Sequence, residues 1–179
     1  MPARTVLQQA DIARALTRIS HEIVESNRDG LDLVLLGIPT RGVVLARRLA
    51  AVIGPDARVG SLDVTMHRDD LARRPTRSPA PTSIPDGGID GALVVLVDDV
   101  LYSGRTIRAA LDALQAIGRP EYVRLATLVD RGHRELPIRP DFVGKNLPSS
   151  RAERINVHLA EIDGDEFVTI ESSGGGDGE

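Results

Sequence analysis

The N-terminal part of the chain begins with an amphipathic pattern. Apolar residues recur at three- and four-residue spacing between residues 10 and 27, which is the spacing of one helical face. The opposite side of this expected helix carries polar and basic residues, among them Thr17, Arg18 and His21. The apolar stripe consists of Ile12, Leu16, Ile19 and Ile23. We therefore expect one face of the helix to be buried and the other to be exposed.

Five further segments are continuously or partly apolar, and helical patterns lie between them. Such apolar runs, bounded by turn residues, are typical of strands covered on both faces. The expected strands are residues 33–38, 61–65, 92–97, 123–129 and 154–162, and the expected helices are residues 42–53 and 103–117. This order predicts an α/β fold with a mostly parallel, twisted sheet and helices on both faces. Ligands then bind beyond the carboxyl ends of strands, in the loops after Ile38, Val97 and Val129.

Two segments lack a helical or strand period. Residues 66–90 contain four prolines and five arginine or histidine residues, and so long a connection inside a compact domain is typical of a functional or disordered loop. We expect a flexible flap there. Residues 171–179 are rich in glycine and serine and are expected to form a disordered tail.

Composition narrows the class of protein. The 179 residues suit one domain, expected over residues 1–170, and the net charge of −4 disfavours non-specific coating of nucleic acid. The lack of cysteine excludes a disulfide framework, a thiolate nucleophile and a cysteine-based zinc site. No apolar run approaches the roughly 20 residues that span a membrane, and the N-terminus lacks an apolar signal core. We expect a soluble cytoplasmic protein with no membrane or DNA partner.

The segment 93–109 combines a buried strand with candidate chemistry. Asp98 and Asp99 follow the apolar run, and a short loop with Ser103 and Gly104 then begins a helix. Backbone N–H groups at a helix N-terminus form an anion site, and glycine lets the backbone approach a phosphate closely. Two adjacent carboxylates can accept hydrogen bonds from the hydroxyls of a ribose. On the residues alone, an ordinary strand-to-helix turn with an Asx cap is the alternative.

Three stretches of the chain resemble a known family. Residues 94–106 resemble the phosphoribosyl diphosphate (PRPP) signature of type I phosphoribosyltransferases. Residues 63–71 and 128–146, with the run Arg-Gly-His-Arg-Glu-Leu-Pro, are similar to the PyrR subfamily, whose members combine uracil phosphoribosyltransferase activity with attenuation of the pyrimidine operon. The similarity extends over residues 12–162. It implies the type I phosphoribosyltransferase fold, with a small hood at about 130–150, and a homo-oligomer.

The resemblance assigns roles to residues at the strand ends. It implies that the aspartate pair holds the ribose hydroxyls and that the loop from Ser103 to Thr106 holds the 5-phosphate. It also implies that Thr40 and Arg41 contact the departing diphosphate. A guanidinium suits the charge that grows there as the C1–O bond breaks, whereas a solvated residue at a helix start is the alternative for Arg41. The implied PRPP- or nucleotide-binding residues are Thr40, Arg41, Asp98, Asp99, Val100, Leu101, Tyr102, Ser103, Gly104, Arg105 and Thr106, of which Asp99 and Arg41 are the expected catalytic residues.

The resemblance also implies a metal and small-molecule ligands. Mg²⁺ is the expected cofactor, contacted by Asp98 and Asp99 indirectly, through PRPP and water. The expected ligands are PRPP, uracil and UMP or UTP. The residues expected over uracil are Val129, Asp130 and Arg131. For Arg131, a surface arginine paired with Asp130 or Glu135 is the alternative.

One backbone feature follows from the proline after the first buried strand. We expect the Ile38–Pro39 peptide to be cis, because proline lowers the cost of a cis bond to about 0.5–1 kcal/mol. A trans proline that begins the next helix is the alternative.

The subfamily resemblance further implies binding of the leader mRNA of the pyrimidine (pyr) operon, dependent on uridine nucleotide. The expected RNA-binding residues are Thr17, Arg18, His21, Arg139 and Lys145. Positive side chains in a chain with 2% aromatic residues suit phosphate contacts on a structured hairpin better than base stacking. Three interpretations stay open: an enzyme that also regulates through RNA, a uracil or purine salvage transferase without RNA binding, and a non-enzymatic regulator that binds PRPP or nucleotide as an effector.

Overall fold

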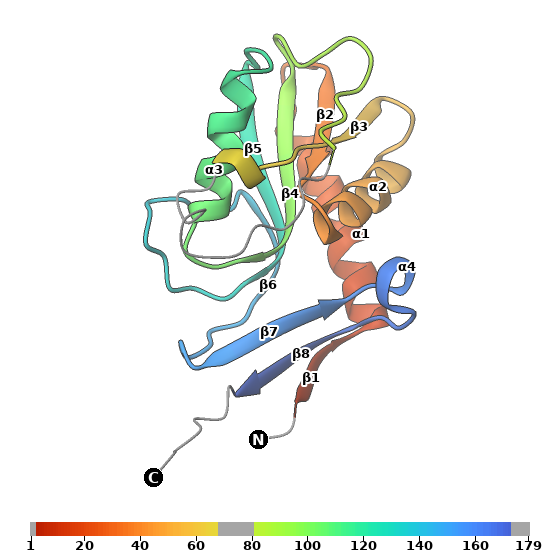
Figure 1. Cartoon of the computed structure of the whole chain (residues 1–179). Helices are drawn as coiled ribbons and strands as arrows, with labels where there is room; N and C mark the ends of the chain where they lie inside the picture. Colours follow the sequence, from red (N-terminus) through yellow and green to blue (C-terminus); the bar gives the residue numbers. More distant parts are fainter. Residues whose placement is uncertain (1–2, 68–80, 173–179) are drawn as a thin grey trace.

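The computed structural model describes residues 3–67 and 81–172. It contains a five-stranded sheet flanked by helices and a three-stranded sheet below one end of it (Figure 1). The strands of the larger sheet are β2 (Leu33–Gly37), β3 (Ala57–Ser61), β4 (Leu93–Leu101), β5 (Tyr122–Asp130) and β6 (Phe142–Asn146). Their order is β3-β2-β4-β5-β6, and every neighbouring pair is parallel. The predicted α/β class is therefore confirmed.

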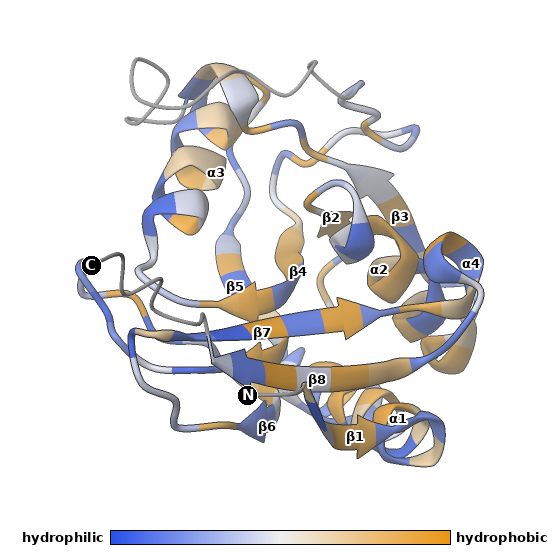
Figure 2. Cartoon of the chain, turned by 60° about the horizontal axis from the view of Figure 1, so that its bottom comes forward, coloured by the Kyte–Doolittle hydropathy of each residue, from blue (hydrophilic) through white to orange (hydrophobic). Residues whose placement is uncertain are grey.

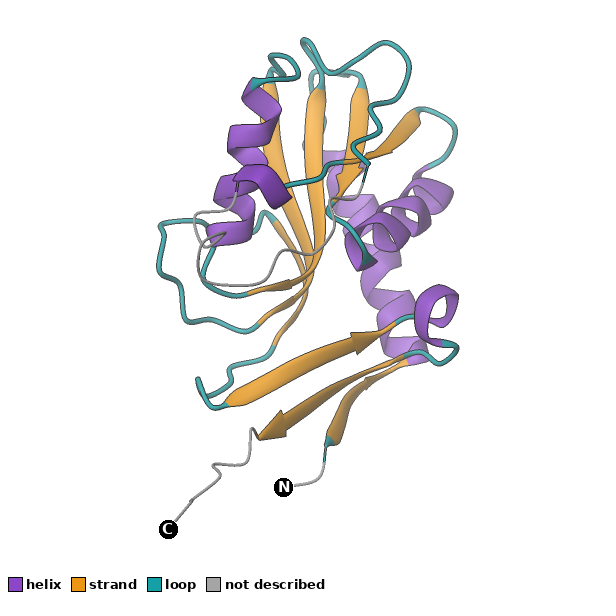
Figure 3. Cartoon of the chain, in the orientation of Figure 1, coloured by secondary structure: helices purple, strands orange, loops and turns teal. Residues whose placement is uncertain are grey.

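Helices cover both faces of this main sheet (Figure 3). α1 (Gln9–Ser26) and α2 (Arg41–Ile53) pack together on one face, and α3 (Arg105–Gln115) packs on the other. Because successive strand residues point to opposite faces, Val95 joins the cluster under α1 and α2, whereas Val94 joins the cluster under α3. Among the described residues, no helix combines the length and apolarity needed to cross a membrane.

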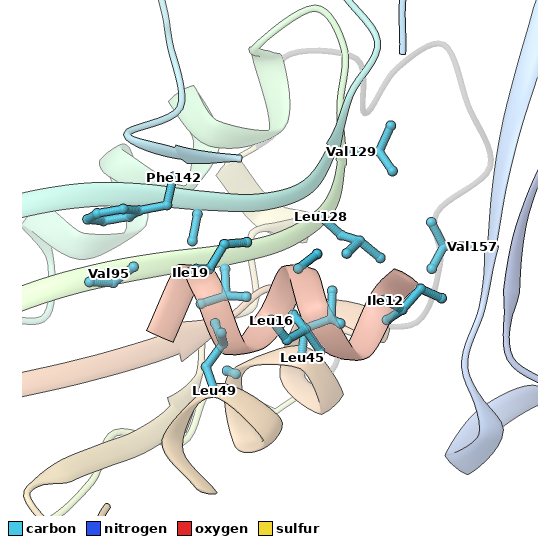
Figure 4. Close-up of a cluster of buried hydrophobic side chains, with 14 of the residues drawn as sticks. Ile12, Leu16, Ile19, Leu45, Leu49, Val95, Leu128, Val129, Phe142 and Val157 are labelled. Atoms are coloured by element: carbon cyan, nitrogen blue, oxygen red, sulfur yellow. The ribbon is translucent and has the colours of Figure 1, made fainter. Parts of the chain in front are cut away.

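The apolar stripe predicted for the first helix is the buried face of α1. In Figure 4, Leu16 and Ile19 point from α1 into the space between the sheet and α2, where Leu45 also lies, and Ile12 lies at the end of α1 on the side of Val157. Ile12 is 0% exposed and Ile19 is 1% exposed. Each such side chain contributes about 1.5–3 kcal/mol on burial, so this face fixes α1 on the sheet.

The smaller sheet, named the hood sheet here, is antiparallel and joins distant parts of the chain. Its strands are β1 (Arg4–Gln8), β8 (Phe167–Ser172) and β7 (Glu153–His158), in the order β1-β8-β7. A single helical turn, α4 (Ala160–Asp163), connects β7 to β8. The hood expected at about residues 130–150 stays a prediction; within that segment, Phe142–Asn146 pairs with β5 as the edge strand of the main sheet.

Several boundaries differ from those expected. The strand expected at 61–65 is β3, which lies earlier because its backbone pairs with β2 from Ala57 onward, and Thr65–His67 is a 3-10 turn. β8 reaches Ser172, past the expected start of the tail. Most of the expected flap and tail, residues 68–80 and 173–179, lies outside the described residues. In the described end of the flap segment, Ser83 pairs with Ser61 through two backbone hydrogen bonds of 2.9 Å.

Candidate active site

A cavity of about 700 Å³ lies between the carboxyl end of the main sheet and the hood sheet. One wall comes from the loop after β2, the end of β4 and the start of α3, and the other comes from β7 and β8. Figure 2 shows β7 crossing in front of β4 and β5. The expected PRPP-binding residues that line the cavity are Thr40, Arg41, Asp98, Asp99, Val100 and Thr106. Three segments that are far apart in sequence therefore meet at the place where parallel sheets bind ligands.

The two aspartates lie inside β4 rather than after it, because β4 continues to pair with β5 as far as Leu101. The Asp99 N–H donates to Asp98 Oδ1 at 2.9 Å, and the Val100 N–H donates to Asp99 Oδ1 at 2.7 Å. These bonds restrict the rotamers of both carboxylates, which are half-buried at the cavity. The pair is suited to accept hydrogen bonds from two neighbouring hydroxyls of a sugar.

The N-terminus of α3 lies at the same cavity. Its N-cap residue, Gly104, has a φ of 93°, a left-handed conformation that glycine adopts without steric cost. Gly104 has no side chain with which to cap the helix, and Ser103 Oγ accepts the Arg105 N–H at 3.3 Å. Because the first N–H groups of a helix lack partners within the helix and carry its positive dipole end, this terminus can bind a phosphate beside Thr106.

The loop between β2 and α2 is held close to β4. The Ile38 N–H donates to the carbonyl oxygen of Val97 at 2.9 Å, and a Cβ atom on Gly42 would lie 2.3 Å from that oxygen. Only glycine therefore lets α2 begin this close to β4. The cis peptide of this loop is Pro39–Thr40, and the expectation of a cis Ile38–Pro39 bond was wrong.

Arg41 is the first residue of α2 and lines the cavity. Arg41 Nη2 donates to Asp163 Oδ1 at 2.9 Å, while Arg41 Nε is buried without a hydrogen-bond partner among the described residues. A hydrogen bond from the Leu159 N–H and, to a smaller extent, the Arg41 charge lower the pKa of Asp163, although burial opposes them. An ionised carboxylate therefore pairs with Arg41 at neutral pH.

The loop after β5 supports the phosphate loop. The N–H groups of Glu135 and Leu136 both donate to the carbonyl oxygen of Ser103, at 2.9 and 3.1 Å. Arg105 Nε donates to Glu135 Oε2 at 2.7 Å, so this expected PRPP-binding residue directs part of its guanidinium to the loop. The Arg-Gly-His-Arg-Glu-Leu-Pro run therefore has a structural role at the phosphate loop.

Arg131 is held mainly by contacts within the protein. Only 9% exposed, it donates from Nε to Ser149 Oγ at 3.1 Å and from Nη2 to two backbone carbonyls, those of Ser150 and Glu153. Its guanidinium also lies 4.4 Å from the centre of the Tyr102 ring. These contacts hold Nε and Nη2 of Arg131 inside the protein and pair them with no carboxylate, and the contact of Arg131 with uracil stays a prediction.

Several other residues expected to contact uracil or PRPP do not line the larger cavity. Val129 and Leu101 are core residues, 0% and 3% exposed, so only their backbone atoms could meet a ligand. Asp130 pairs with Arg134 at 2.6 Å. Asp130 and Arg131 line a second cavity of about 330 Å³, which shares no lining residue with the first.

Sequence reasoning missed the hood side of the larger cavity. Hood residues that line it include Arg154, Asn156, His158, Thr169 and Glu171. Asn156 Nδ2 donates to Glu171 Oε1 at 2.7 Å, and the His158 ring stacks on Phe167 at 4.4 Å. The alternation of polar and apolar residues in β7, visible in Figure 2, was a signal for this wall.

The residues expected to bind RNA lie on α1, on β6 and in the loop before β6, and all are exposed. Arg18 pairs with Glu22 at 2.8 Å and donates from Nη2 to the carbonyl oxygens of Val143 and Gly144, at 2.9 and 2.8 Å. It therefore attaches α1 to the edge strand β6, on which Lys145 lies. The exposed face of α1 and Lys145 therefore lie on neighbouring elements, which a single RNA-binding surface would require.

Comparisons with known proteins identify the family. A model described as phosphoribosyl transferase domain matches residues 3–160. The chain is 70% identical to a protein named bifunctional protein PyrR of Leifsonia xyli subsp. xyli, over 97% of this chain and 100% of that one. It is 64% identical to the Streptomyces coelicolor protein of the same name, over 94% and 89% of the two chains.

Solved structures share the fold. A hypoxanthine-guanine phosphoribosyltransferase of Bacillus anthracis superposes with a TM-score of 0.72 at 18% identity, covering 93% of this chain and 96% of the other. A hypoxanthine phosphoribosyltransferase of Staphylococcus aureus gives a TM-score of 0.70 at 18% identity, covering 92% and 90%. With the family model and the relatives at this level of identity, the chain belongs to the type I phosphoribosyltransferases and, within them, to the PyrR subfamily.

Proposed function

We propose that this phosphoribosyltransferase transfers the ribose 5-phosphate group of PRPP to uracil, giving UMP and diphosphate, and that it also binds pyr leader mRNA in a uridine nucleotide-dependent way. The observation that carries the enzymatic part is the meeting of an aspartate pair, the N-terminus of α3 and Arg41 in one cavity. The name of the relatives, bifunctional protein PyrR, supports a second, regulatory activity.

The cavity offers a matching group for each part of PRPP. Asp98 and Asp99 would accept hydrogen bonds from the ribose hydroxyls, and the N-terminus of α3 with Thr106 would hold the 5-phosphate. Arg41 would neutralise charge on the diphosphate as the C1–O bond breaks. Asp99, which lines the cavity, is also the candidate catalytic residue in contact with the reacting ribose.

The aspartate pair also fits an indirect Mg²⁺ contact. Magnesium in phosphate-transfer sites is usually bound by one or two carboxylates together with substrate phosphates and water. Asp98 and Asp99 supply carboxylate oxygens at the cavity, and the described residues contain no cluster of three or more metal-binding side chains that would act as a separate cage. When bound, the ion would neutralise part of the diphosphate charge.

A base-specificity assay tests the enzymatic proposal. The wild-type protein is incubated with PRPP, Mg²⁺ and either uracil, hypoxanthine or guanine, and nucleotide formation is measured. UMP formation with little purine nucleotide is the expected result. Purine nucleotide without UMP would instead support purine salvage, the activity named for the structural neighbours, and no nucleotide from any base would support a non-enzymatic regulator.

A binding titration tests the RNA proposal. The pyr leader transcript of the source genome is titrated with the protein, with and without UMP, against a scrambled transcript of equal length. We expect tighter binding to the leader that strengthens with UMP and weakens as salt rises, because phosphate contacts release counterions. Equal affinity for both transcripts would remove the regulatory half of the proposal and leave a salvage enzyme. The homo-oligomer stays an expectation from the resemblance, and light scattering measures it.

A further inference from the structure

The Arg41–Asp163 ion pair joins the two walls of the cavity at one point. Arg41 comes from the start of α2, whereas Asp163 is the last residue of α4 in the connection between the hood strands β7 and β8. Their side chains meet at 2.9 Å, and they are 32% and 20% exposed. Arg41 lines the cavity, but Asp163 is not among the described residues that line it, so the carboxylate contacts the guanidinium from outside the cavity.

Asp163 is itself held in place. Its second oxygen, Oδ2, accepts the N–H of Leu159, a fully buried residue, at 2.9 Å. The same helical turn is attached to α2 by Arg48, which donates to both oxygens of Glu161, at 2.9 and 2.5 Å, and also pairs with Glu166. Because both oxygens of Asp163 have partners and α4 is anchored, the carboxylate is a fixed point for Arg41.

Within the described residues, few other contacts orient the Arg41 side chain. The hydrogen bond to Asp163 is the one recorded for its guanidinium within residues 3–67 and 81–172, and its buried Nε has no partner there. An arginine side chain has several rotatable bonds, so holding it in one geometry costs conformational entropy. A preformed ion pair restricts the side chain before the ligand binds, so that less entropy is lost on binding. The side chain that faces the cavity is therefore oriented from the hood.

We propose that Asp163 is a positioning residue, which holds the Arg41 guanidinium at the cavity for the diphosphate group of PRPP. This inference rests on the proposed function, because it assigns the leaving group to Arg41. Asp163 acts through Arg41 and does not touch the substrate. The effect of changing Asp163 should therefore disappear when Arg41 has already been removed.

A double-mutant cycle provides the test. Asp163→Asn and Asp163→Ser retain an oxygen that can accept the Leu159 N–H, but both lack the charge that pairs with Arg41. The cycle combines each with Arg41→Ala and measures kcat, KM for PRPP and the affinity for Mg²⁺-diphosphate by calorimetry. We expect each Asp163 variant to lower kcat/KM for PRPP and diphosphate affinity by about tenfold, as for loss of one charge-assisted hydrogen bond, with an unchanged KM for uracil.

The decisive result is that Asp163→Asn has no further effect in the Arg41→Ala background. Additive losses would show a role independent of Arg41, and tighter diphosphate binding by Asp163→Asn would show that Asp163 competes with the ligand; either would overturn the proposal. Asp165→Asn, the same charge change at an exposed position two residues on, is the matched control and should have wild-type values. If wild-type protein forms no UMP, the proposed uracil activity fails, while the calorimetric cycle still tests Asp163.

Discussion

Arg134 donates from Nη1 to the carbonyl oxygen of Tyr102 at 2.8 Å, which joins the loop after β5 to the loop that precedes α3. The same guanidinium donates to the carbonyl oxygen of Ile138 at 2.7 Å and to Asp130 Oδ2 at 2.6 Å. One side chain thus fixes three backbone or side-chain acceptors around the candidate phosphate site. A lysine ammonium cannot reproduce this planar fork.

We therefore predict that Arg134→Lys weakens the phosphate loop. The free energy of unfolding should fall by about 1–3 kcal/mol, because partly buried acceptors lose their donors, and KM for PRPP should rise several-fold. Denaturant unfolding and steady-state kinetics measure the two effects. Arg119→Lys, at an exposed position after α3, is the control. A wild-type KM in a destabilised Arg134→Lys protein would separate the loop from PRPP binding.

The aspartate pair should be needed for turnover but not for folding. Asp98→Asn and Asp99→Asn each replace a charged acceptor by a neutral amide at the cavity, where charge-assisted hydrogen bonds to ribose hydroxyls would be lost. We expect kcat/KM for PRPP to fall about 30- to 100-fold, with an unchanged circular dichroism spectrum. Asp112→Asn on the exposed side of α3 is the matched charge control. Near-wild-type kinetics in both variants would exclude the pair from ribose binding.

Arg18 and His21 should behave differently although both lie on the exposed side of α1. Arg18 satisfies two carbonyl oxygens of the edge strand β6, so Arg18→Ala should lower the free energy of unfolding by about 1 kcal/mol as well as affecting RNA. His21→Ala should leave stability unchanged and weaken binding of the pyr leader transcript, with uracil turnover unaffected. Chemical denaturation and RNA titration check both variants. RNA affinity that falls only with stability would remove α1 from the RNA-binding surface.

Stability at acid pH should depend on Glu161. Its hydrogen bonds with Arg48, opposed by partial burial, lower the pKa of Glu161 below the ordinary value of 4.5. The folded state therefore binds fewer protons than the unfolded state, so the stabilisation is present above pH 4.5 and is lost as the pH falls through the lowered value. Because the side chain is 48% exposed, the effect should be below about 1 kcal/mol. Glu161→Gln should be less stable than wild type at neutral pH, and its free energy of unfolding should change less as the pH falls below 4.5. A pH profile parallel to that of wild type would contradict this.

The central strands of the main sheet, β2, β4 and β5, were predictable because they carry their own signal, whereas the edge strand β6 was not among the expected strands. β2 and the first part of β4 are buried on both faces. Burial on both faces requires a continuous run of apolar residues, whichever strands lie beside them. The extension of β4 through Asp98 and Asp99 was not predictable in this way. Aspartate disfavours strands, and pairing with β5 overrides that preference.

The pairing of the hood strands was not predictable from local pattern, although the alternation in β7 indicated a strand. β1 and β8 are short, and their register pairs Arg4 with Ile170, two residues at opposite ends of the described chain. Neither strand has a signal of its own that names its partner. The same reason hid Asp163, whose relation to Arg41 depends on how the β7–β8 connection folds back onto α2. The motif residues were recognisable because they are consecutive in sequence.

The hood sheet also has a consequence for biosynthesis. Its central strand, β8, is the last described element, and both of its neighbours need it as a hydrogen-bonding partner. Residues 33–146 of the main sheet are translated earlier, so the aspartate pair and the phosphate loop can be assembled on the ribosome while β1 still lacks its partner. The second wall of the cavity includes residues of β8, so it can be complete only after Ser172 has been translated and has left the exit tunnel.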